Sequence, residues 1–162
     1  MDPKQTTIGR AEYVNLPEYT KTPIPARVDT GAKTSAIWAS NIIEKDGVLM
    51  YSLFGQGSQL YTGNTVRTKT YSQRLVANST GHVQQRYAVR KVVSLKGRKI
   101  RATFTLADRS EQVYPILLGR NVLRGKFIVD VKLGTPLLKQ ERLREVQKQA
   151  AIDALHADKD SV

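Results

Sequence analysis

The chain has 162 residues, 40% of them hydrophobic, and a formal net charge of +12. This length and composition predict one globular domain with a modest core. The absence of cysteine excludes disulfides, thiolate nucleophiles and cysteine zinc sites. No apolar run reaches bilayer length, and residues 1–10 lack the apolar stretch of a signal peptide. We therefore expect a cytoplasmic protein, although a chain whose signal had been removed would look the same.

An excess of basic residues attracts polyanions such as nucleic acid, an anionic membrane or an acidic peptide. The alternative is an ordinary solvent-exposed basic surface without a specific partner. The two histidines, His82 and His156, lie far apart in the sequence and form no HExxH pattern. A catalytic zinc site is therefore not expected. We predict that the protein needs no metal and no cofactor.

From residue 9 to about residue 134, the pattern predicts mostly β-structure. Ile100, Ala102, Phe104 and Leu106 alternate with polar residues, as in a strand with one buried face. Turn signals at 78–81 and 96–99 predict two hairpins. The expected strands are 26–28, 48–54, 73–77, 84–93, 92–95, 100–106, 113–118 and 127–131.

Two helical segments are expected near the C-terminal end. Residues 121–124, which precede Gly125, predict one short helical turn. The sequence therefore divides into a polar N-terminal tail (1–8), a β-domain (9–134) and a C-terminal helical extension (135–162).

The C-terminal extension carries the signals of an amphipathic helix. Thr135 can cap a helix whose first residue is Pro136. Leu143, Val146 and Ala150 recur at helical spacing, which predicts a helix as far as about residue 158. We take packing on its own β-domain as the default, with a second subunit or another protein as alternatives.

Residues 26–32, with the sequence ARVDTGA, carry the first candidate for chemistry. A strand delivers the Asp29 carboxylate to a tight turn, where Gly31 supplies backbone freedom. The hydroxyl of Thr30 can form a hydrogen bond across a subunit interface. Asp-Thr-Gly alone is weak evidence, because ordinary turns produce it often.

Residues 114–123, with the sequence YPILLGRNVL, form a second element some ninety residues after Asp29. An apolar strand is followed by a glycine and a polar helical turn. By itself this pattern is also typical of a core strand followed by a surface helix. The end of the apolar strand, the glycine and the start of the turn are formed by Leu117, Leu118, Gly119, Arg120 and Asn121.

In this order and at this spacing, the two elements resemble the retropepsins, the dimeric aspartic proteases that include the retroviral enzymes. The resemblance covers roughly residues 20–132. It implies a mainly β fold, a closed acid-protease barrel, with Asp29, Thr30 and Gly31 as the catalytic loop. It also implies that the strand at 116–118 threads past this loop and supports it.

Residues 27–36, with the sequence RVDTGAKTSA, are similar to the hallmark of a bacterial family called ATP-dependent zinc proteases or retropepsin-like aspartic endopeptidases. Residues 80–82 with Arg86 and Tyr87, and residues 106–111, resemble two further motifs of that family. Some of its members accompany ATP-grasp glutamate ligases, which implies a functional link to such a ligase. The sequence contains no Walker loop and no cluster of metal ligands to support the ATP and the zinc of the family name.

The chain departs from the retroviral pattern after the Asp-Thr-Gly-Ala segment. Typical retroviral enzymes have acids there, one of which pairs with the arginine after the late glycine. Here Lys33 and Thr34 occupy those positions, while Arg120 is retained. Because Lys33 and Arg120 would repel each other, Arg120 must have another partner.

The single Asp-Thr-Gly has a mechanistic consequence. One carboxylate cannot serve as general base and general acid on the same amide, so two copies of Asp29 must meet in a homodimer. The hairpin at 74–88 is the candidate for a flap over the substrate, with an ordinary surface hairpin as the alternative. The candidate substrate-binding and flap residues are Ala32, Gly81, His82 and Arg86.

The predicted function is that of an aspartic endopeptidase that cleaves peptides, with acidic peptides favoured by the basic charge. A catalytically inactive peptide- or partner-binding protein of the same fold is the main alternative. Nucleic-acid binding is less favoured, because the sequence shows no helix-turn-helix and no RNP-like aromatic motif.

Overall fold

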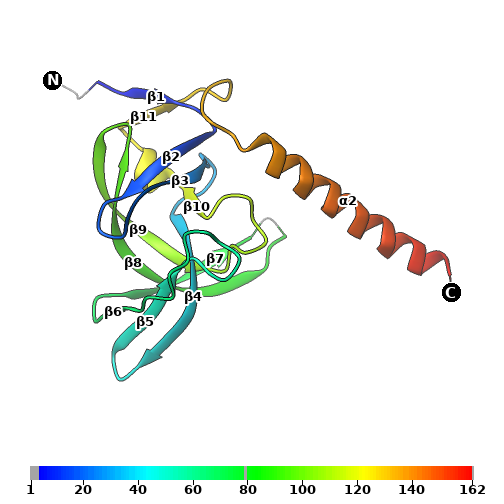
Figure 1. Ribbon diagram of the computed structural model, residues 1–162, viewed down its shortest axis with the longest axis horizontal. Coiled ribbons are helices and arrows are strands. Elements are labelled where there is room, and N and C mark those ends of the chain that lie inside the picture. Colours follow the sequence, from blue (N-terminus) through cyan, green and yellow to red (C-terminus); the bar gives the residue numbers. More distant parts are fainter. Residues whose placement is uncertain (1–3, 79, 162) are drawn as a thin grey trace.

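The computed structural model describes residues 4–78 and 80–161. It consists of a β-barrel from which one long helix extends (Figure 1). The elements are β1 (Thr6–Ile8), β2 (Ala11–Leu16), β3 (Thr20–Val28), β4 (Ser35–Lys45), β5 (Val48–Leu53), β6 (Val66–Thr68), β7 (Ser72–Ala77), β8 (Val83–Leu95), β9 (Arg98–Ala107), β10 (Ile116–Leu118), α1 (Arg120–Leu123), β11 (Phe127–Val129) and α2 (Leu138–Asp160).

The barrel is closed by the short strand β10. It pairs in parallel with β3 and antiparallel with β4, and so completes a ring in the order β10, β3, β2, β8, β9, β4. Ile116 lies opposite Ala26 on one side and Ile37 on the other. Closure leaves no free edge in the ring, which is one way in which all-β proteins avoid edge-to-edge aggregation. This confirms the expected retropepsin-like barrel.

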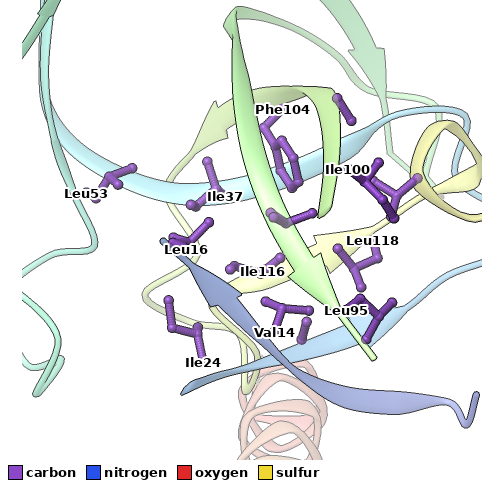
Figure 2. Close-up of a cluster of buried hydrophobic side chains, with 14 of the residues drawn as sticks. Val14, Leu16, Ile24, Ile37, Leu53, Leu95, Ile100, Phe104, Ile116 and Leu118 are labelled. Atoms are coloured by element: carbon purple, nitrogen blue, oxygen red, sulfur yellow. The ribbon is translucent and has the colours of Figure 1, made fainter. Parts of the chain in front are cut away.

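The core fills the inside of the ring (Figure 2). Val14, Ile24, Ile37, Phe104 and Ile116 come from five different strands and are each fully buried. On β9 the four apolar residues of the predicted alternation are buried and Arg101 is exposed, but Thr105, predicted on the polar face, is buried as well. The period of two therefore follows from a strand that lies with one face on this core.

Both predicted hairpins are present. β7 pairs with β8 from Ser72 opposite Ala88 to Ala77 opposite Val83, and the turn between them includes Ser79, which lies outside the described residues. β8 continues to Leu95 as one strand and returns as β9 through Lys96 and Gly97, with φ angles of 50° and 77°. Two such residues in succession suit the twist of a two-residue hairpin.

Several predicted bounds were wrong. The strand predicted at 113–118 begins only at Ile116, because residues 113–115 lie in the loop that leads to it. The strand predicted at 127–131 ends at Val129. Four strands, β1, β2, β4 and β6, were not predicted; β1 pairs in parallel with β11, with Thr6 opposite Phe127.

The C-terminal helix differs most from its prediction. It begins at Leu138, without a side-chain cap from Thr135, and none of its residues is buried. Figure 1 shows α2 extending away from the barrel, so the default expectation that it packs on the β-domain was wrong for most of its length. Leu143 and Ile152 lie nine positions apart. At about 100° per residue they point to opposite sides, so the apolar residues do not form one face.

No helix in the described part of the chain is long and apolar enough to cross a bilayer.

Candidate active site

Asp29 lies directly after β3, at the start of a tight loop that we call the Asp29 loop (residues 29–34). Its N–H donates to the carbonyl oxygen of Leu118 at 2.9 Å, so the loop begins bonded to β10. Its Oδ1 accepts the Gly31 N–H at 2.9 Å. The side chain is partly exposed. The backbone therefore holds the carboxylate in one orientation at the surface of a cavity.

Gly119, the residue after β10, passes through the Asp29 loop. A Cβ atom at this position would lie 2.3 Å from the carbonyl oxygen of Thr34 and 2.9 Å from that of Ala32. Next to it, the Arg120 N–H donates to Ala32 O at 2.8 Å. Only glycine permits so close an approach of two backbones, which explains the glycine of the predicted motif.

A buried polar network at Ser35, the first residue of β4 after the Asp29 loop, supports the same crossing. The hydroxyl of Ser35, which is fully buried, accepts the Gly119 N–H at 2.9 Å and donates to Asn121 Oδ1 at 2.7 Å. Asn121 Nδ2 in turn donates to the carbonyl oxygen of Thr103 at 2.8 Å. The network thus links β4, the residue after β10, α1 and β9. The sequence indicated Asn121 but assigned no role to Ser35.

Arg120 binds the backbone of the Asp29 loop instead of an acidic side chain. Its Nη1 donates to the carbonyl oxygens of Gly31 at 2.9 Å and Thr30 at 3.3 Å. The guanidinium therefore braces the tip of the Asp29 loop from the side of α1. A backbone acceptor replaces the acidic partner found in the retroviral pattern.

The β7–β8 hairpin and the Asp29 loop line one cavity of about 710 Å³. Asp29 and Ala32 lie on one side of it, and Arg74 and Arg86 on the other. Gly81 and His82 are exposed in the turn of the hairpin and are not among the lining residues. The structure thus brings Ala32 and Arg86 to the cavity that contains Asp29, and leaves Gly81 and His82 at the end of the hairpin.

The cavity is strongly cationic. Arg109, in the loop before β10, lines it together with Arg86. Burial, reinforced by the positive charges of Arg86 and Arg27, lowers the pKa of Arg109 to about 10, while Asp29 acts in the opposite direction. Burial also lowers the pKa of Arg86. Sequence reasoning placed Arg109 in a motif without a role, since nothing local shows that its loop folds back beside Asp29.

A second, more apolar cavity of about 770 Å³ also adjoins the Asp29 loop, through Thr30 and Lys33. Thr30 is at its rim, and Leu123, Phe127 and Val129 form its apolar wall. Arg120 and Arg124 also line it. The exposed Thr30 hydroxyl therefore lies beside an apolar surface formed by α1 and β11.

Within the described residues, no group of three or more His, Cys, Asp or Glu side chains is placed to hold a metal ion. The chemistry available beside Asp29 is that of one carboxylate and several cations. A carboxylate of this kind can take a proton from water, but protonation of a leaving group needs a second acid.

Curated relatives share sequence with most of this chain. Proteins named "Probable alpha-L-glutamate ligase" from Desulfotalea psychrophila and Shewanella halifaxensis are each 31% identical to it, over 88% and 80% of the chain. The chain spans only 30% and 29% of their lengths. The similarity therefore concerns one part of these larger proteins.

A solved structure shares the fold. The Legionella pneumophila protein Lpg0085, whose function is unknown, superimposes with a TM-score of 0.60 at 23% identity, over 81% of this chain and 97% of that one. A family model for the retropepsin-like aspartic endopeptidase RimB matches residues 7–135, which contain the barrel, the Asp29 loop and the bracing strand β10. This chain belongs to the RimB-like family of retropepsin-like aspartic endopeptidases.

Proposed function

We propose that the protein is an aspartic endopeptidase that works as a homodimer, in which each subunit contributes one Asp29. The observation that carries this proposal is the Asp29 carboxylate, held by backbone hydrogen bonds at a cavity that the β7–β8 hairpin also lines. Membership of the retropepsin-like family supports the same assignment.

The chemistry requires two carboxylates. Two such groups about 3 Å apart share one proton, because both cannot be ionised at that distance. The ionised Asp29 takes a proton from water as the water oxygen bonds to the amide carbon, and the protonated Asp29 gives its proton to the carbonyl oxygen. Collapse of this intermediate breaks the C–N bond as a proton passes to nitrogen, which yields a carboxylic acid and an amine.

The surface beside Thr30 is suited to a second subunit. Thr30 is exposed, and partly exposed Val129 lines the adjacent cavity, together with Leu123 and Phe127, which are already buried within the subunit. Burial of apolar area is the main favourable term in association. A two-fold axis at this face would bring the two Asp29 loops together.

Acidic peptides are the proposed substrates. Arg74, Arg86 and Arg109 line the cavity with Asp29, and Lys33 lies on the Asp29 loop itself. Arginine binds carboxylates with two parallel hydrogen bonds, so these residues suit glutamate and aspartate side chains. The relatives named as glutamate ligases are consistent with a role alongside such a ligase.

The test compares Asp29→Asn with a matched control, Asp46→Asn, at an exposed turn between β4 and β5. With glutamate-rich peptides, we expect the wild type and Asp46→Asn to cleave alike. Asp29→Asn should lose at least about 10³-fold in rate while it remains folded and dimeric. Turnover by a clean Asp29→Asn preparation would contradict the assignment of Asp29. A strictly monomeric particle in light scattering would contradict the dimer.

A further inference from the structure

A separate, basic cavity of about 330 Å³ lies where the first turns of α2 approach the barrel. The barrel contributes Arg10, Arg27 and Arg109 to its lining, and α2 contributes Arg144 and Lys148. Two carboxylates, Glu141 and Glu145, complete the charged groups around it. Cations therefore outnumber acids in this cavity.

The base of α2 is fixed in place by Glu141. Its carboxylate accepts two hydrogen bonds from Arg10, at 2.8 and 2.9 Å, and one from the Tyr114 hydroxyl at 2.6 Å. The same hydroxyl accepts the N–H of Leu137 at 2.9 Å. Glu141 is thus occupied by Arg10. Although most of α2 extends away from the barrel, its first turns are held beside the cavity.

The remaining cations lack matching acids. Among residues 4–78 and 80–161, Arg27, Arg109 and Lys148 form no salt bridge. Arg144 pairs with Glu111 through Nη2 at 2.9 Å, but its buried Nε meets no acceptor among the described residues. A buried donor without a partner is costly, and cations that lie close together raise each other's free energy even where, as at Arg27 and Lys148, the residues are exposed. An anion in this cavity would relieve both.

We propose that this cavity is a subsite for the side-chain carboxylates of an acidic peptide, and that α2 completes it with Arg144 and Lys148. The inference rests on the proposed function and gives α2 a role in substrate binding. Arg109 lines both this cavity and the one that contains Asp29, and Arg27 lies two positions before Asp29 in the chain. An extended peptide that passes Asp29 therefore has a continuous cationic path to α2.

The experiment measures binding in Asp29→Asn protein, so that the peptide is not consumed. The probe is a fluorescent oligoglutamate of about eight residues, which extends to roughly 26 Å. Fluorescence anisotropy compares Arg144→Gln/Lys148→Gln with Lys139→Gln/Arg142→Gln. The control pair removes the same charge from exposed positions of the same helix that do not line the cavity.

We expect the Arg144/Lys148 pair to weaken oligoglutamate binding by about 10-fold or more, and the Lys139/Arg142 pair by less than about 2-fold. Two single variants, Arg27→Gln on the barrel side and Lys148→Gln on the helix, should each also weaken oligoglutamate binding. These two variants keep the contact between Arg144 and Glu111. An oligoglutamine of equal length should be insensitive to all of them. Equal effects of the two helix pairs, or none, would overturn the proposal.

A single-stranded oligonucleotide of matched charge tests the rival anion. If binding of the oligonucleotide depends on Arg144 and Lys148 while binding of oligoglutamate does not, the cavity is not a peptide subsite. Peptidase activity is tested separately, by measuring cleavage of oligoglutamate in protein that retains Asp29. Binding that follows the predicted pattern without cleavage in the wild type would reject the peptidase and keep the subsite. If the wild type cleaves oligoglutamate at a rate that the Arg144 and Lys148 substitutions do not change, the peptidase is kept and the subsite is rejected.

Discussion

Arg120 donates a hydrogen bond to the carbonyl oxygen of Gly31 at 2.9 Å, across 89 positions of sequence. The bond joins the first residue of α1 to the loop that carries Asp29. The guanidinium thus orients backbone, whereas the retroviral pattern gives it an acidic side chain.

Replacement of Arg120 by lysine should impair function more than stability. Lysine keeps the charge but loses the planar donor that reaches the loop. We expect the free energy of unfolding to fall by about 1 kcal/mol or less, since the contact is exposed. Peptide cleavage should fall by about 10-fold or more, because small displacements of reacting groups are costly. Arg124→Lys, which lines the same apolar cavity, is the control and should leave both quantities unchanged.

Ser35→Ala should destabilise the fold by about 1–3 kcal/mol, measured by urea unfolding. The substitution leaves the Gly119 N–H and the Asn121 amide oxygen without their partner in a buried site. A double-mutant cycle with Asn121→Ala should give a coupling energy between about 0.5 and 3 kcal/mol. Strictly additive effects would show that the two side chains do not act as a unit.

Gly119→Ala should cost about 3 kcal/mol or more, because its Cβ would overlap the backbone of Thr34, which cannot swing aside as a side chain can. Gly47→Ala is the matched control. Gly47 has a φ of 75°, and an added Cβ atom would meet none of the described residues within 4 Å, so only backbone strain of about 1 kcal/mol is expected there. Similar losses at the two positions would argue against the close crossing of the two backbones.

The attachment of α2 should depend on pH. The hydrogen bonds from Arg10, followed by that from Tyr114, hold the pKa of Glu141 below its ordinary value of 4.5. A carboxyl with a lowered pKa in the folded state stabilises the protein above its unfolded-state pKa, and the effect disappears as the pH falls through the folded-state value. Wild type should therefore exceed Glu141→Gln in unfolding free energy at neutral pH.

This difference should shrink below pH 4.5, the ordinary pKa of the group. Glu145→Gln provides the comparison on the same helix, because Glu145 forms no salt bridge within the described residues. The unfolding free energy of the Glu145→Gln variant should equal that of the wild type at every pH. A Glu141→Gln variant as stable as the wild type at neutral pH would show that the helix base contributes nothing.

The sequence predicted β-strands and a hairpin where the signals are local. The alternation on β9 and the turn residues at Lys96 and Gly97 act within a few residues of their own positions, whereas the closed barrel was expected only from the family resemblance. The order and spacing of the two motifs then indicated the family. Asp29, Ala32 and Arg86 could be selected on this basis.

Contacts between residues far apart in the sequence could not be predicted from local patterns. Arg109 approaches Asp29 only because its loop folds back, and Ser35 acquires its role only when β10 is inserted beside β4. The course of α2 was also mispredicted, because Leu143 and Val146 at helical spacing do not show whether a surface exists for them to cover. The hydrogen bonds of Glu141 and the ion pair between Arg144 and Glu111, which hold the first turns of the helix beside the barrel, are contacts between distant parts of the chain.

The insertion of β10 between β3 and β4 has a consequence for biosynthesis. Asp29 emerges from the ribosome long before residues 116–119, which supply both the strand partner and the glycine that fix its loop. Contacts so distant in sequence form late, because a large loop must close first. A nascent chain that ends before residue 116 therefore carries the acid without the framework that orients it, so under the proposed function it could not yet cleave a peptide.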